Sequence, residues 1–204
     1  MLIRGTKMPT KQTDAVKYLV NCRNLEYATY SLYSAVTKKL KRPEINCILR
    51  GIAQDCFKHT KIIEELFKPL SFASYESGKN DKNYNKLSSE IRKYTNNLTP
   101  IEVFNDDEMP DLLNDLTEIE DCLSDFYSYF IDSQMLKQFT DQLSTVTDIT
   151  EENLLFILKI LKIDKLKHRN MLVETLHFYK ESKLRNRDTT PLVRFQNPDA
   201  WIHY

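Results

Sequence analysis

The sequence has little glycine, and this scarcity limits the fold classes that it can adopt. Only three glycines occur among 204 residues, whereas β-sheet proteins use glycine in many of their tight turns. The chain also lacks an apolar stretch of the roughly 20 residues that cross a bilayer, and its first residues contain no apolar segment typical of a signal peptide. We therefore expect a cytoplasmic protein of long helices with no membrane partner.

Two further absences exclude common binding classes. The chain carries no net charge, because 29 lysines and arginines balance 29 acids, and we therefore expect no nucleic-acid partner. The cysteines form no C-x-x-C pair, which argues against a zinc ribbon or a thioredoxin-type site. We expect them to be reduced and buried as small apolar residues. They are Cys22, Cys47, Cys56 and Cys122.

Hydrophobic periodicity predicts four long helices. Apolar residues recur every three or four positions, which is typical of amphipathic helices. Pro43 suits the first turn of the second helix, and Thr150, followed by two glutamates, suits the start of the fourth. We expect the third helix to bend near 132–134. The predicted helices cover about 13–41, 43–68, 110–143 and 150–184.

The connections between these helices predict their arrangement. Short turns after the first and third helices imply two antiparallel hairpins, whereas a solenoid of helix pairs needs at least three units. The crossover 69–109 is polar, with a weak helical piece near 86–94, and the residues 185–204 have no helical period. The sequence therefore predicts an all-α fold: an antiparallel four-helix bundle over 1–184, with one long crossover connection and a C-terminal tail.

The second helix of each hairpin carries the same motif, D-x-x-x-H. Residues four apart lie on one face of a helix, so the carboxylate and the imidazole point the same way. Each first helix offers a glutamate that lies about as far from the turn as the histidine does, and therefore at about the same level. We expect six residues to converge inside the bundle: Glu26, Asp55, His59, Glu120, Asp164 and His168.

Four carboxylates in an apolar core need compensation. Burying isolated ions is costly, and like charges raise each other's pKa. Two divalent metal ions would resolve this conflict. Mixed carboxylate and imidazole ligands suit iron or manganese, whereas structural zinc more often recruits thiolates. The pattern therefore predicts a metal site.

This arrangement resembles the ferritin-like superfamily of di-iron carboxylate proteins, and its rubrerythrin-type members in particular. That family takes one Glu from each first helix and a Glu-x-x-His from each second helix. The resemblance implies that Glu26 and Glu120 match its carboxylates, that His59 and His168 match its histidines, and that two iron ions, or manganese, are the cofactors.

The chain departs from the family at one position in each repeat. The acid three residues before each histidine is replaced by Cys56 in one repeat and Lys165 in the other. Asp55 and Asp164 replace it only if their shorter side chains reach the metal. The shared departure fits a coordinated variant, and it also fits a relative that has lost its metals. A lysine beside a dinuclear site is repulsive unless it points elsewhere.

The resemblance implies an oxidoreductase, a di-iron oxidase or peroxidase acting on dioxygen, peroxide or ferrous iron. Because the chain has no rubredoxin-like C-x-x-C module, a peroxidase needs an external electron donor. Tyr30 and Tyr33 follow Glu26 at helical spacing and are candidates either to bond the ligands or to pack in the core. The alternative is a metal-free helical bundle that serves as an interaction module, and a homo-oligomer is a candidate in either case.

Overall fold

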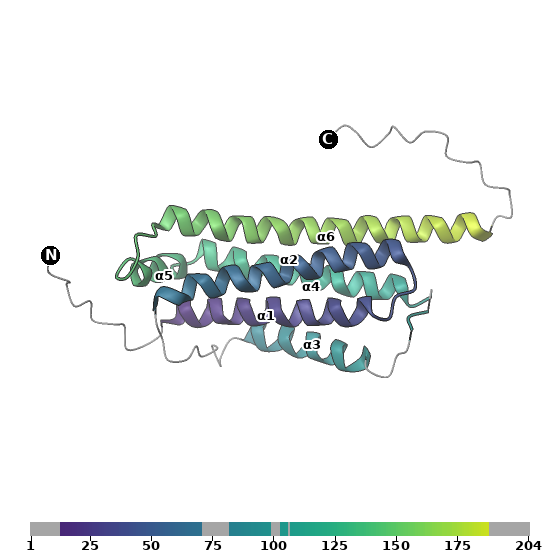
Figure 1. The fold of residues 1–204 in the computed structure, drawn as a ribbon, viewed down its shortest axis with the longest axis horizontal. Coiled ribbons are helices and arrows are strands. Elements are labelled where there is room, and N and C mark those ends of the chain that lie inside the picture. The colour runs from purple at the N-terminus through teal and green to yellow at the C-terminus, as the bar shows by residue number, and fades with distance from the viewer. Residues whose placement is uncertain (1–12, 71–81, 99–102, 106, 188–204) are drawn as a thin grey trace, which may run out of the picture.

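The computed structural model describes residues 13–70, 82–98, 103–105 and 107–187, and all regular structure among them is helical (Figure 1). The all-α prediction is therefore confirmed for this part of the chain. The predicted tail from residue 188 onward, and residues 71–81 and 99–102 of the crossover, lie outside it. The elements are α1 (Asp14–Thr37), α2 (Pro43–Phe67), the short 3-10 helix η1 (Lys68–Leu70), α3 (Lys82–Leu98), α4 (Met109–Asp132), α5 (Met135–Leu143) and α6 (Glu151–Arg187).

Local sequence sets the starts of three of the long helices. The Thr13 hydroxyl accepts a hydrogen bond from the backbone N–H of Val16 at 3.3 Å, which caps α1. Pro43 opens α2 where no backbone donor is needed. At the start of α6, the hydroxyl of Thr150 accepts from the N–H of Asn153 at 3.2 Å, and the Asn153 side chain accepts in return from the Thr150 N–H. This exchange has the form of a capping box.

Two segments differ from their predicted form. The expected bend near 132–134 is a full break between α4 and α5, where Ser133 is extended and its hydroxyl accepts from the N–H of Met135 at 3.2 Å. The crossover contains a 17-residue helix, α3, which is longer than the piece expected at 86–94. Leu87 and Ile91 of α3 are buried and α3 packs on α1, so tertiary contact stabilises a segment that contains few apolar residues.

The four long helices lie roughly side by side (Figure 1), and their pairing places the core. Helix α1 packs mainly against α2, and α4 against α6, while contacts of α1 with α4 and of α2 with α6 join the two pairs. Helix α3 lies outside α1, and α5 contacts the long helices near the start of α6. Fully buried apolar side chains line the interior on all four helices, and they include Leu25, Leu49, Leu116 and Leu158.

The cysteines divide into two groups. Cys22 and Cys56 are buried, as predicted, but the prediction of burial is wrong for Cys47 and Cys122, which are exposed. Their helices turn those two positions away from the interior, because a cysteine inside a helical pattern need not lie on its apolar stripe. None of the described helices is long and apolar enough to cross a membrane.

Candidate metal centre

A cluster of charged side chains lies in the middle of the four long helices. Each of its members is at most 2% exposed, although charged residues are rarely buried without partners. Helix α1 supplies Glu26, α2 supplies His59, α4 supplies Glu120, and α6 supplies both Lys165 and His168. The inward faces of four separate helices thus meet at one dry position.

Lys165 lies at the centre of this cluster and points inward. Its Nζ is 2.7 Å from Oε2 of Glu26, 3.3 Å from Sγ of Cys56 and 3.4 Å from Oε2 of Glu120. An ammonium has three protons to donate, and three acceptors surround it. Burial alone would lower the pKa of Lys165, but these neighbours raise it well above its ordinary value. The lysine is therefore a permanent cation inside the protein.

The two glutamates are its counter-ions. Burial by itself would raise the pKa of Glu26, but the Lys165 ammonium and the neighbouring His59 side chain lower it to about 2. The pKa of Glu120 is also lowered, against the effect of burial, by Lys165 and His168. Both carboxylates are therefore ionised at neutral pH, and one ammonium lies between them.

Two tyrosines bond these carboxylates across the interior. The Tyr33 hydroxyl, from α1, donates to Oε1 of Glu120 at 2.9 Å, and the Tyr127 hydroxyl, from α4, donates to Oε1 of Glu26 at 2.8 Å. Burial and the facing carboxylates raise both phenol pKa values well above the ordinary range, so the phenols stay protonated. Of the two predicted tyrosines only Tyr33 reaches the cluster, because Tyr30 packs against Phe57 instead.

Each predicted aspartate lies beside the histidine of the other hairpin. Oδ2 of Asp55 is 3.2 Å from Nε2 of His168, and Oδ2 of Asp164 is 3.3 Å from Nε2 of His59. Both aspartates are partly exposed and also pair with a lysine on their own helix. They do not point at the centre. Instead they hold the outer nitrogen of each imidazole and thereby direct its Nδ1 inward.

The inner nitrogens of the histidines face the glutamates. Nδ1 of His168 is 3.4 Å from Oε2 of Glu120, and Nδ1 of His59 is 3.4 Å from Oε1 of Glu26. The second contact satisfies the distance of an ion pair but not the angles of a hydrogen bond, so Nδ1 of His59 has no hydrogen-bond partner within the described part of the chain. A buried imidazole nitrogen that is oriented from behind and left unbonded in front is arranged as a metal ligand would be.

The six residues selected from the sequence therefore come together in one network, four of them facing the centre and two supporting the histidines from outside. The network is duplicated, with the two hairpins contributing the same residue types at equivalent positions. The equivalent pairs are Glu26 and Glu120, Tyr33 and Tyr127, Asp55 and Asp164, and His59 and His168.

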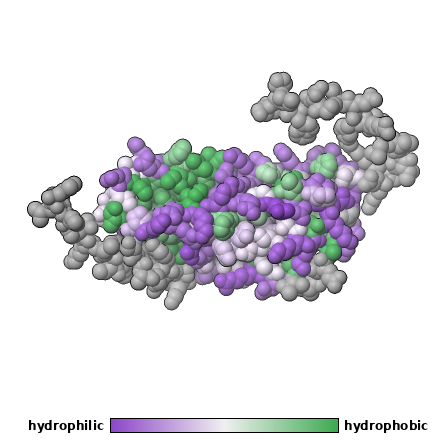
Figure 2. Space-filling view, viewed as in Figure 1, coloured by the Kyte–Doolittle hydropathy of each residue, from purple (hydrophilic) through white to green (hydrophobic). Residues whose placement is uncertain are grey.

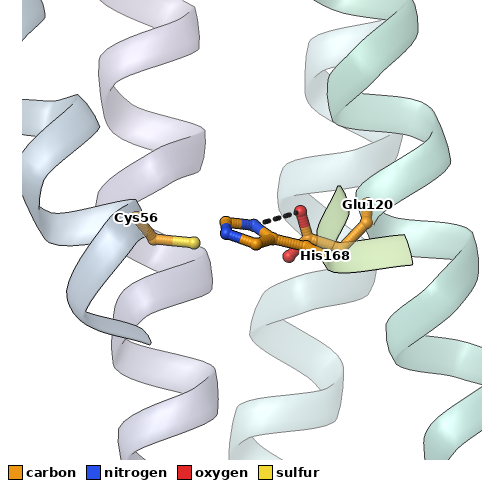
Figure 3. Close-up of side chains that lie close together, drawn as sticks. All are labelled: Cys56, Glu120 and His168. Atoms are coloured by element: carbon orange, nitrogen blue, oxygen red, sulfur yellow. Dashed lines mark hydrogen bonds and ion pairs between the residues drawn. The ribbon is translucent and has the colours of Figure 1, made fainter. Parts of the chain in front are cut away.

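The duplication fails at the residue three positions before each histidine, which is Cys56 in one hairpin and Lys165 in the other. We call Cys56, Glu120 and His168 the sulfur half-site, and we call their equivalents, Lys165, Glu26 and His59, the lysine half-site. In the sulfur half-site one ligand atom from each residue lies within 4.8 Å of the other two. Figure 3 shows the Cys56 side chain pointing toward the ring of His168, with the carboxylate of Glu120 on the other side of that ring.

Cys56 is a ligand candidate outside the six residues that the sequence predicts. Its place three residues before His59, where the proteins that the sequence resembles have an acid, is the signal that points to it. Burial raises the pKa of the Cys56 thiol well above its ordinary value, although Lys165 opposes this effect. The sulfur is thus a neutral thiol until a metal ion displaces its proton.

No family model matches the chain, and no curated protein or solved structure matches it either. What the centre can do therefore follows from its geometry and charge.

Proposed function

We propose that this protein binds one divalent transition-metal ion at the sulfur half-site. The proposal is supported by a buried sulfur, a carboxylate oxygen and an imidazole nitrogen that lie within 4.8 Å of one another. Thiolate, imidazole and carboxylate together suit zinc or another ion of borderline softness. Three protein ligands leave a fourth position of a tetrahedral ion open.

Charge favours one ion over the two irons that the resemblance implies. With the metal bound, Cys56 is a thiolate, and together with Glu26 and Glu120 it carries three negative charges. One divalent ion and the Lys165 ammonium balance these charges. A second divalent ion would have to share Glu26 with an ammonium that already lies 2.7 Å from its carboxylate, and two cations on one carboxylate repel each other strongly in a buried site.

The architecture that carries this site is, in our proposal, a divergent ferritin-like four-helix bundle. The hairpin pairs α1 with α2 and α4 with α6 support it, as does the position of α3, which follows the first pair in the sequence and precedes the second. A glutamate from each first helix and a histidine from each second helix then occupy the positions that such bundles use for metal.

The surrounding residues would hold the ligands in place. Asp55 fixes the outer nitrogen of His168, and Tyr33 holds one oxygen of Glu120 while the other faces the centre. Such outer contacts orient ligands and strengthen metal binding. A bound ion would act as a Lewis acid.

The direct test is metal analysis of the purified full chain, followed by titration of the metal-free protein with cobalt(II). We expect one equivalent to bind, with the intense near-ultraviolet absorption of a cobalt–thiolate bond. Cys56→Ser should abolish that absorption, and His168→Ala should weaken binding at least 10-fold. His177→Ala is the matched control, because His177 lies on the same helix but is exposed. A folded wild-type chain that takes up no ion would refute the proposal.

A second candidate function, self-association, is favoured by the outer face of α6. Seven large apolar side chains of α6 are exposed, five of them along one face by helical spacing, and Figure 2 shows a hydrophobic patch over the first half of this helix. Their positions are nearly symmetric about Lys167, which forms an ion pair with Asp164 at 3.0 Å. An isologous dimer requires such a self-complementary surface. The five are Phe156, Ile160, Ile163, Met171 and Phe178.

In this dimer a second copy would pack its α6 antiparallel to the first, placing Phe156 opposite Phe178 of the partner subunit. Both phenylalanines are at least 60% exposed in the single chain. Sedimentation velocity should then show a dimer that Phe156→Glu dissociates, whereas Lys159→Glu leaves it intact. A wild-type chain that stays monomeric at high concentration would remove this candidate.

A further inference from the structure

We propose that Lys165 is a tethered cation that occupies the lysine half-site and so limits the centre to a single metal ion. This inference rests on the proposed function, since it explains why one ion binds where a duplicated site would hold two. It predicts that the second position is latent, and that replacing the lysine by an acid opens it.

The geometry supports this role because the lysine half-site keeps two of three ligands. Glu26 is fully buried with one carboxylate oxygen on Lys165, and His59 presents a buried Nδ1 that makes no hydrogen bond to any described residue. The ammonium lies 2.7 Å from the carboxylate that would otherwise bind an ion. The half-site thus has an imidazole and a carboxylate in place, and a cation already in the third position.

The equivalent side chain in the other half-site shows the contrast. Cys56 and Lys165 face each other at 3.3 Å, and both are fully buried. A cysteine sulfur is a group that can coordinate a metal ion, whereas the Lys165 side chain fills the equivalent place with a cation that is bonded to Glu26 and repels an incoming ion. The two half-sites are otherwise matched in glutamate, histidine, tyrosine and aspartate. Because the Lys165 ammonium lies nearer to Glu26, at 2.7 Å, than to Glu120, at 3.4 Å, we expect it to exclude an ion from the lysine half-site first.

Charge balance sharpens the prediction for a variant. In Lys165→Glu, the new carboxylate would join Glu26, Glu120 and the Cys56 thiolate, and two divalent ions would balance the resulting four negative charges. The variant also places an acid three residues before His168, as in the Glu-x-x-His pattern of two-metal bundles. We therefore expect the metal count to rise from one to two.

The experiment is a cobalt(II) titration of the full-length chain, followed by metal analysis after desalting. Wild type should saturate at one equivalent and K165E at two. The first equivalent should show the thiolate absorption of Cys56, and the second should add little to it, because no second sulfur is present in the cluster. Lys159→Glu is the control, since it makes the same charge change on an exposed turn of α6 and should still saturate at one.

Lys165→Met is a second variant that keeps the inference testable if K165E does not fold, because methionine has a side chain of similar length without a charge. Circular dichroism would check that each variant keeps its helices. We expect this variant to bind a second ion more weakly than K165E does, since it lacks the added carboxylate.

The outcomes separate the two proposals. A wild-type chain that binds no ion overturns the proposed function and this inference with it. Wild type with one ion, and folded K165E and Lys165→Met that also stop at one, overturns the role of Lys165 but leaves the sulfur half-site standing. Wild type that binds two ions also overturns the role of Lys165.

Discussion

The sulfur half-site and the lysine half-site of the central cluster use equivalent positions of the two hairpins and differ in one side chain. In each half a glutamate accepts from a tyrosine of another helix and faces a histidine that an aspartate holds from outside. At the remaining position one half has Cys56 and the other has Lys165. In our proposal, the internal repeat keeps its geometry while one exchange converts a place for a metal into a place for a built-in charge.

The largest expected effect is on stability, and it tests whether Glu26 stabilises the buried Lys165 ammonium more than Glu120 does. In the metal-free protein, Glu26→Gln removes the negative charge nearest to the Lys165 ammonium, at 2.7 Å, and leaves Glu120, at 3.4 Å, as its counter-ion. Because removing the nearer partner of a buried ion pair is costly, we expect a loss of about 3 kcal/mol in the free energy of unfolding. Glu120→Gln should cost less, about 1–3 kcal/mol. Urea unfolding at pH 7 with a chelator measures both, and equal losses would contradict the assignment.

The second prediction uses acid to weaken the same contact. The pKa of Glu26 is lowered from 4.5 in the unfolded chain to about 2 in the fold. Its stabilising contribution, roughly 3 kcal/mol by linkage, is therefore fully present above pH 4.5 and disappears as the pH falls through about 2.

The measurement is the urea midpoint of the metal-free chain between pH 6 and pH 2, compared with that of Glu26→Gln. Wild type should lose its advantage over the variant progressively in this window, because the amide of the variant does not titrate. A stability difference that stays constant down to pH 2 would show that Glu26 is not held ionised by its partners.

The smallest expected changes in stability come from replacing Tyr33 or Tyr127. These two variants also test whether the sulfur half-site and the lysine half-site differ in metal binding. Tyr33→Phe and Tyr127→Phe each remove one hydrogen bond to a charged carboxylate, so each should cost about 1.5–3 kcal/mol in the metal-free chain. Only Tyr33 supports Glu120, a proposed ligand. We therefore expect Tyr33→Phe to weaken cobalt binding and Tyr127→Phe to leave it unchanged, as measured by competitive titration. Equal weakening by both would mean that the halves do not differ in function.

Much of the helical pattern followed from local rules. The starts of α1, α2 and α6 lie within about a residue of the expected positions, because Thr13, Pro43 and Thr150 act on the backbone beside them. The break at Ser133 and the full length of α3 were not foreseen in detail. Whether an apolar segment bends or breaks, and whether a polar one becomes helical, depends on what it packs against.

For the central cluster too, part of the arrangement followed from local spacing and part depended on how the helices pack. Helical spacing indicated that Glu26, His59, Glu120 and His168 face one interior, but it did not indicate what Asp55 and Asp164 do there. A spacing of four residues defines the face of a helix, while the neighbour that a side chain meets depends on how the helices pack. The aspartates reach the histidines of the opposite hairpin, an arrangement that a pattern within one helix does not contain.

The sequence by itself determined that this protein is helical and that two acid–imidazole sets repeat in it, since periodicity and spacing are properties of a single helix. Only the tertiary structure decided that Lys165 points into the centre, where it meets Glu26, Glu120 and Cys56. The physical reason is that the cost of burying a charge depends on the partners around it, and those partners come from three other helices.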